Sequence, residues 1–135
     1  MTPADEIRNL LQRYARAADQ RDLDVLAACF HPEAQITGAR GPLDLEAWLA
    51  TMSGPRAFPT SMHLLSDPLL ELEEAVGSEA TASARTDTYA VVFQLGDPDG
   101  DQGDLTLGIR YLDDLVVLDG RWVIARRVAT TLWMR

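Results

Sequence analysis

Residues 61–74, SMHLLSDPLLELEE, decide the fold, because here the spacing of apolar side chains changes from helical to the period of β-strands. Three further strand-like runs follow, at residues 79–95, 104–118 and 121–134. They are separated by AVGS, by GDPDGDQG and by Asp119-Gly120, a dipeptide typical of tight hairpins. Helical spacing before residue 60 and long, antiparallel strands after it predict an α+β fold, not alternating βαβ units.

Three helices are expected upstream of this point. Thr2 reads as the N-cap of the first helix, Asp22 as the cap of a short second helix, LDVLAACF, and Asp44 as the start of a third. A brief extended piece, AQIT, and a turn, GARGP, lie between the second and third helices. The apolar stripes of the first and third helices are Ile7, Leu10, Leu11, Tyr14 and Ala18, then Leu45, Trp48, Leu49 and Met52.

Length and charge narrow the class of protein. The 135 residues fit one domain, 1–135, able to bury a core without disulfides, and a single cysteine permits no internal one. The net charge of -9 argues against nucleic acid or an anionic membrane surface as partner, since both require a basic patch. No apolar run is long enough to span a membrane, and the N-terminus lacks a signal peptide, so we expect a cytoplasmic protein.

Motifs for metals and cofactors fail on inspection. GDPDGDQGD places acids like a calcium loop from Asp97, but Gln102 and Gly108 stand where such a loop needs glycine and glutamate. The two histidines, His31 and His63, have no zinc-binding frame around them. Nucleotide-binding and serine-hydrolase motifs do not occur. We therefore expect no cofactor and no metal.

Ionisable residues embedded in apolar patterning are the useful signal. Asp87 shares a strand face with Tyr89, and His63 stands between apolar neighbours. Arg126 and Arg127 occupy opposite faces of the last strand, and parity alone does not choose between them. Each group either meets a partner in a functional pocket or makes an ordinary structural contact.

Tyr14 and Asp19 pose a related question. Five residues separate them, so on an ideal helix they point about 140° apart. One helix face cannot hold both side chains. They can share a site if the chain bends at Asp19 or if a cavity reaches round the end of the helix.

Three fragments carry a family resemblance: YARAADQRDLDVLAACFHPEAQI, SMHLLSDPLLEL and DGRWVIARRVATTLW. In order and spacing they resemble the SnoaL-like (polyketide-cyclase-like) family of the nuclear-transport-factor-2-like superfamily, over essentially the whole chain. The resemblance implies a cone: a curved mixed β-sheet wrapped around N-terminal helices, with a deep apolar pocket. It also implies a homodimer formed through the outer sheet surface, to which we assign Ala82, Ala84, Ala90 and Val92.

Within that family the motifs are most similar to bile-acid 7α-dehydratase-type enzymes. Carried over to this sequence, the resemblance implies a catalytic set on the first helix, an early strand, the next strand and the last strand: Tyr14, Asp19, His63, Asp87 and Arg127. It also settles the choice between the two arginines in favour of Arg127. The aromatic residues expected to line the substrate pocket are Phe30, Trp48, Tyr89, Tyr111 and Trp133.

Two classes of function remain open from the sequence. The first is a cofactor-independent, dehydratase-type lyase that moves protons on a hydrophobic small molecule bearing carbonyl and hydroxyl groups, such as a polyketide, steroid or terpenoid; an isomerase or aldol-type cyclase would use the same groups. The second is a non-catalytic cone, either a ligand-binding module or a subunit like the small subunit of ring-hydroxylating dioxygenases.

Overall fold

The computed structural model describes residues 1–73 and 82–135, so the predicted AVGS separator lies outside the described residues. The chain begins with three helices: α1 (Pro3–Gln20), α2 (Leu23–Ala28) and α3 (Leu45–Thr51). Thr2, Asp22 and Asp44 cap them, each accepting a hydrogen bond from a backbone N–H in the first turn. The three predicted helix starts are confirmed.

The described strands form one mixed sheet in the order β2-β1-β7-β6-β5-β3, with β4 also paired to β5. The β1–β7 pair is parallel, whereas the other pairs are antiparallel. The predicted α+β class with a mixed, curved sheet is confirmed. The strand bounds are β1 (Phe30–Gly38), β2 (Gly41–Asp44), β3 (Thr60–Leu65), β4 (Leu69–Glu73), β5 (Ser83–Leu95), β6 (Leu105–Leu118) and β7 (Arg121–Met134).

Two strands differ from the sequence prediction. The stretch 61–74 is not one strand, because the chain leaves the sheet at residues 66–68, where Pro68 has no N–H to donate. Its halves, β3 and β4, pair with successive parts of β5. The extended piece AQIT belongs to a longer strand that starts at Phe30, directly after α2.

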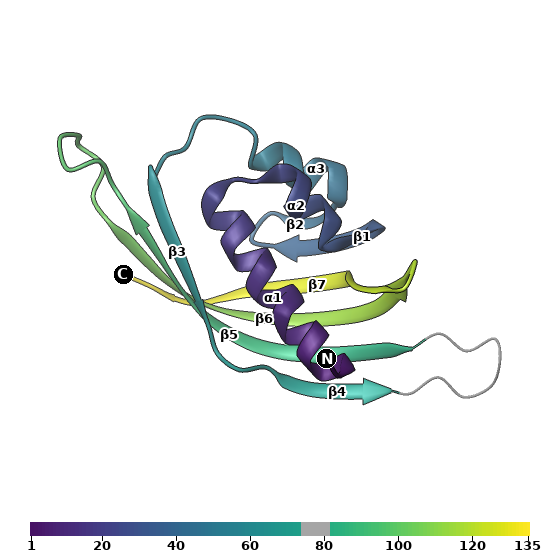
Figure 1. The fold of residues 1–135 in the computed structure, drawn as a ribbon. Helices are drawn as coiled ribbons and strands as arrows, with labels where there is room; N and C mark the ends of the chain where they lie inside the picture. Colours follow the sequence, from purple (N-terminus) through teal and green to yellow (C-terminus); the bar gives the residue numbers. More distant parts are fainter. Residues whose placement is uncertain (74–81) are drawn as a thin grey trace.

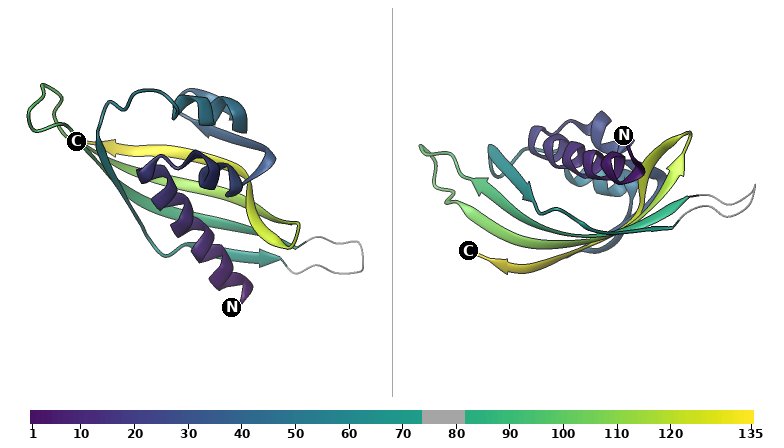
Figure 2. Two further views of the ribbon diagram at one scale, coloured as in Figure 1. Left: turned by 45° about the horizontal axis from the view of Figure 1, so that its top comes forward. Right: turned by 60° about the horizontal axis from the view of Figure 1, so that its bottom comes forward.

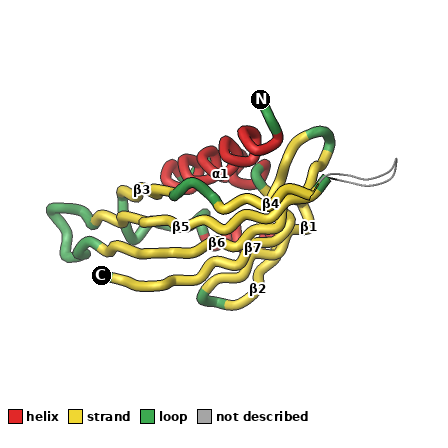
Figure 3. The backbone as a smooth tube through the Cα atoms, turned by 90° about the horizontal axis from the view of Figure 1, so that it is seen from below, coloured by secondary structure: helices red, strands yellow, loops and turns green. Residues whose placement is uncertain are grey.

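The helices cover the concave side of the curved, unclosed sheet, and α1 lies across the strands (Figure 1). The bowl shape is clearest in the right view of Figure 2, where the helices lie above the sheet. From below, no helix of the described part of the chain lies on the opposite face of the sheet (Figure 3). None of the helices described combines the length and apolar character needed to cross a bilayer.

Because the helices cover the concave face of the sheet, the core fills the space between α1 and that face. Ile7, Leu10, Leu26, Leu115 and Ile124 are buried there.

The inner face of β5 corrects one sequence prediction. Ala84, Ala90 and Val92 are buried in the core, and Ala82 packs against it, instead of lying on the outer surface. The outer face of β5 carries the residues of opposite parity, including Asp87 and Tyr89.

The β6–β7 turn should be sensitive to its glycine. Gly120 has φ +78, a conformation in which a Cβ is unfavourable, and Asp119 precedes it with φ 51. We expect Gly120→Ala to lower the free energy of unfolding by about 1–2 kcal/mol in urea titrations. Gly103→Ala is the matched control, since its Cβ would meet nothing within 4 Å and no positive φ applies. Equal losses in the two variants would contradict this explanation.

Candidate active site

Asp19 in the last turn of α1 is held against β3 by three contacts. Alternation along β3 points Ser61 and His63 inward, while Met62 and Leu64 are exposed. Asp19 Oδ1 accepts a hydrogen bond from Ser61 Oγ at 2.9 Å and lies 2.6 Å from His63 Nδ1. Its other oxygen accepts from the His63 backbone N–H at 2.9 Å. The carboxylate therefore has a fixed position and orientation.

This arrangement fixes which imidazole nitrogen is basic. A carboxylate can only accept a hydrogen bond, so Nδ1 of neutral His63 must carry the proton. Nε2 is left with its lone pair and makes no hydrogen bond to any residue in the described ranges. The pair thus presents one oriented proton acceptor.

Tyr14 connects this pair to the rest of the interior. Its ring meets the His63 ring edge-on at a centroid distance of 6.3 Å and stacks on Trp48 at 6.4 Å. Phe30 and Tyr111 approach it edge-on, each at 6.0 Å. Helix α1 stays helical through Asp19 and ends at Gln20, so the chain does not bend at Asp19. His63 brings the two together, because its ring reaches from the Asp19 carboxylate to the Tyr14 ring.

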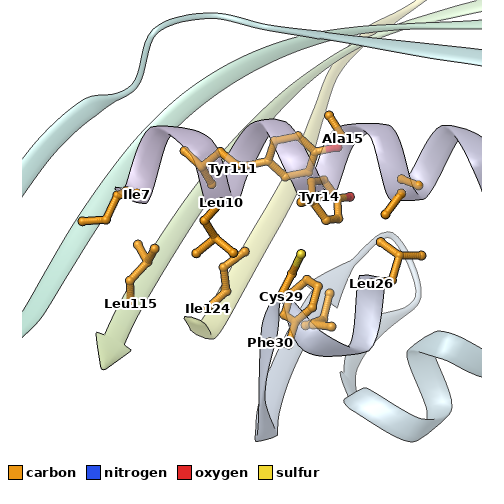
Figure 4. Close-up of a cluster of buried hydrophobic side chains, with 14 of the residues drawn as sticks. Ile7, Leu10, Tyr14, Ala15, Leu26, Cys29, Phe30, Tyr111, Leu115 and Ile124 are labelled. Carbon is orange, nitrogen blue, oxygen red and sulfur yellow. The ribbon is translucent and has the colours of Figure 1, made fainter. Parts of the chain in front are cut away.

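Arg127 is the largest fully buried side chain, only 2% exposed. It donates from Nε and Nη2 to the two carboxylate oxygens of Asp113, at 2.8 and 2.9 Å. Its guanidinium lies 4.0 Å from the Tyr14 ring centroid and 4.1 Å from that of Tyr111. Figure 4 shows these two tyrosines among the core side chains beneath α1. The remaining nitrogen, Nη1, is buried without a hydrogen-bond partner in the described residues.

Burial and charge set the protonation of this cluster. Desolvation raises the pKa of Tyr111 well above its usual range, the neighbouring Tyr14 raises it further, and the Arg127 cation opposes the shift. Burial disfavours the Arg127 cation, but Asp113 outweighs it and the pKa of Arg127 rises. Tyr111 therefore stays a neutral phenol and Arg127 a cation across the physiological pH range.

A cavity of about 420 Å³ opens next to this cluster, between the β1–β2 hairpin, α3 and the concave face. Its volume suits a small organic molecule. Tyr14, Trp48, Tyr111 and Arg127 are among its lining residues. Asp19 and His63 are not, so Tyr14 is the residue that touches both the cavity and the imidazole.

Comparison with known proteins identifies the family. The sequence profile of the SnoaL-like domain matches residues 2–128. The chain belongs to the SnoaL-like family. An uncharacterized protein of Mycobacterium tuberculosis is 32% identical over 136 residues, covering 96% of this chain and 86% of the relative.

Two solved structures show the SnoaL-like architecture in similar form. A scytalone-dehydratase-like protein of Novosphingobium aromaticivorans superposes with a TM-score of 0.80 at 22% identity, covering 97% of this chain and 85% of that one. A hexachlorocyclohexane dehydrochlorinase of Novosphingobium barchaimii gives 0.76 at 16% identity, covering 97% and 87%. At these identities the likeness concerns the fold alone.

Three residues that the SnoaL-like resemblance assigned to the site lie elsewhere. Asp87 and Tyr89 are on the outer face of β5, where Asp87 pairs with Arg110 and Tyr89 is 58% exposed. The cause is strand parity, since their neighbours face the core. Trp133 is also exposed and lies against Gly108 on β6, where a Cβ would collide with the indole. Tyr14, Asp19, His63 and Arg127 gather at one place, with Phe30, Trp48 and Tyr111 around Tyr14.

Sequence reasoning missed two polar residues of the SnoaL-like core. Ser61 stands two residues before His63 and therefore shares its strand face, which could have suggested a contact with the same carboxylate. Asp113 lies on the strand face of Tyr111 and Leu115, both buried. An acid among buried residues was a signal that a cation faces it. Within the described ranges, no group of three or more His, Cys, Asp or Glu side chains is placed to hold a metal ion.

Two arginine–aspartate pairs allow a matched test of burial. Asp113→Asn removes the carboxylate that, among the described residues, pairs with buried Arg127, so we expect a loss of about 3–5 kcal/mol in the free energy of unfolding. Asp87→Asn breaks the corresponding pair with Arg110, whose side chain is 42% exposed, and should change stability far less. Both are measured by denaturant titration. Similar small changes in the two variants would show that Arg127 does not depend on its partner.

Proposed function

We propose that the protein is a cofactor-independent lyase of the dehydratase type, acting on a hydrophobic small molecule with a carbonyl and a β-hydroxyl group. The observation that carries the proposal is the 2.6 Å contact between His63 Nδ1 and the immobilised Asp19 carboxylate, beside the Tyr14 ring. A histidine oriented in this way is a suitable general base near neutral pH.

The proposed reaction has two steps. A substrate whose carbonyl end passes beyond the cavity wall at Tyr14 would bring its α carbon to the neighbouring His63 ring. His63 Nε2 removes a proton from that carbon, and the electron pair forms an enolate whose oxygen accepts a hydrogen bond from the Tyr14 hydroxyl. The enolate then re-forms the carbonyl, a carbon–carbon double bond forms, and the β-hydroxyl leaves with the proton carried by the imidazolium. Water is released and His63 returns to its neutral state, so no external reactant is required.

Each group has a physical reason for its role. Asp19 stabilises the imidazolium that forms on proton transfer and keeps Nε2 as the basic nitrogen. The Arg127 guanidinium, held in place by Asp113, lies 4.0 Å from the Tyr14 ring centroid and so helps to position that phenol. Burial of Tyr14 and Tyr111 strengthens these electrostatic effects, because little water screens them.

Mutation tests the catalytic role of the His63–Asp19 pair. His63→Ala and Asp19→Asn should each reduce turnover by about 10²–10⁴-fold, the usual contribution of general base catalysis. The double variant should be scarcely worse than either single one, since the two groups act as a unit. Tyr14→Phe should cost about 10–10³-fold, as the loss of one oxyanion donor. The readout is dehydration of the aldol of benzaldehyde and acetone to the conjugated enone, followed by ultraviolet absorption, together with α-carbon deuterium exchange by NMR.

The other histidine provides the control. His31 lies on β1, and its Nδ1 accepts a hydrogen bond from the Glu33 backbone N–H, so His31→Ala should leave turnover unchanged. Near-native turnover in His63→Ala, with circular dichroism showing an intact fold, would disprove the mechanism. Deuterium exchange without dehydration would instead favour an isomerase or aldol-type cyclase built on the same groups.

We also propose a homodimer formed through the outer face of the sheet. Large apolar side chains are exposed there, among them Met62, Leu64, Tyr89 and Leu112. Leu64→Glu combined with Leu112→Glu should convert the dimer to a monomer in light scattering, because it places charges on this face. Ala28→Glu adds a charge to an exposed position of α2 and should leave the dimer intact. A wild-type protein that is monomeric at micromolar concentration contradicts the proposal.

A further inference from the structure

The charged residues lining the cavity are all cationic. Arg21, Arg40 and Arg127 contribute to its wall, and no aspartate or glutamate of residues 1–73 and 82–135 does. The chain as a whole has the opposite bias, with Asp+Glu 21 against Lys+Arg 12. The cavity therefore concentrates positive charge within an acidic protein.

The lining arginines that form no ion pair in the described residues lie on the solvent side of the cavity. Arg127 is buried and neutralised by Asp113, as described above. Arg21 is half-buried, Arg40 is exposed, and neither forms an ion pair with a carboxylate in the described residues. We call Arg21 and Arg40 the mouth arginines. An oxyanion entering here would meet two cations that have no counter-ion among the described residues.

Arg21 lacks a hydrogen-bond partner at one nitrogen. Nη1 donates to the Met52 carbonyl at 3.3 Å, but Nε is buried and makes no hydrogen bond within the described residues. Burial lowers the pKa of Arg21, and the nearby cation of Arg56 lowers it further. A bound oxyanion would satisfy Nε and offset the repulsion between the two guanidinium groups.

The backbone at Arg21 gives a second reason to look for a role of its side chain. Arg21 is the C-cap of α1 with φ 54 and ψ 39, the left-handed conformation for which glycine is the usual residue. An arginine is less stable than glycine or asparagine in this conformation. The helix end therefore does not explain the choice of arginine, whereas the cavity does.

We propose that the substrate carries an oxyanion, a carboxylate or a phosphate, held by the mouth arginines while its carbonyl end reaches Tyr14. The inference rests on the proposed function in taking this cavity to be the substrate site. A guanidinium fork matches the oxygen pair of a carboxylate or phosphate and remains charged at every physiological pH. The aromatic lining formed by Trp48, Tyr14 and Tyr111 then receives the apolar body of the molecule.

Calorimetric titration with three probes tests the proposal: a naphthoate, its neutral amide and the corresponding naphthyl phosphate. At low salt the wild type should bind the carboxylate or the phosphate at least about tenfold more tightly than the amide, because only the anions form charge-assisted hydrogen bonds. The anion with the lower dissociation constant shows whether the site prefers a carboxylate or a phosphate. Arg21→Asn, which suits the left-handed backbone, should reduce the preference to about twofold or less without lowering stability.

Arg16→Gln is the matched control, because it removes the same charge at a position away from the cavity. Arg16 is exposed on α1 and donates a hydrogen bond to the Gln12 side chain. This variant should retain the full preference for the anion. The proposal is overturned if the wild type binds neither anion more tightly than the amide. It is also overturned if the preference survives in the double variant Arg21→Asn, Arg40→Ser.

Binding and turnover separate this inference from the proposed function. The titration needs no reaction, and His63→Ala should keep the preference for the anion. A wild type that dehydrates the aldol through His63 but shows no such preference would overturn the inference alone. A wild type that prefers the anion but catalyses neither exchange nor dehydration, even with the aldol of 4-carboxybenzaldehyde and acetone, which carries a carboxylate, would overturn the proposed function alone.

Discussion

The buried guanidinium of Arg127 is the interaction on which the interior depends. A cation removed from water is stable only with a counter-ion and with favourable surroundings, and both are present. Asp113 supplies the charge from the adjacent strand, while the rings of Tyr14 and Tyr111 approach the group with their centroids 4.0 and 4.1 Å from it. Helix α1 and strands β6 and β7 are therefore joined at one point. The same point sets the position of Tyr14, which faces both the cavity and His63.

Periodicity and capping predicted most of the fold. The helix starts at Thr2, Asp22 and Asp44, the change to strands after residue 60 and the Asp119-Gly120 hairpin follow from local rules, and the structure has each of them. Strand faces were less predictable. The apolar residues beside Asp87 made its face look internal, but this sheet has apolar side chains on both faces, so alternation alone did not show which one α1 covers.

The arginine pairing could not be read from local rules. A two-residue turn at Asp119-Gly120 pairs Leu118 with Arg121, and the same register continued would place Asp113 opposite Arg126. A β-bulge between Asp114 and Leu115 shifts the ladder by one residue and places Asp113 opposite Arg127. The family resemblance favoured Arg127 over Arg126 as a site residue without any information about this bulge. The bulge depends on packing across the whole sheet, which no short stretch of sequence encodes.

The parallel pairing of β1 with β7 has a consequence for how the protein folds. Phe30 pairs with Ile124 and Ile36 with Arg127, so a strand near the beginning of the chain completes its ladder only with the last one. Contacts this distant in sequence slow folding, because a long loop must close before they contribute any stability. During synthesis, β1 and β2, which line one side of the cavity, cannot pair with the rest of the sheet until β7 has left the ribosome. The cavity is thus completed only when β7 joins the sheet, and a chain truncated before β7 would keep its helices but lack this cavity.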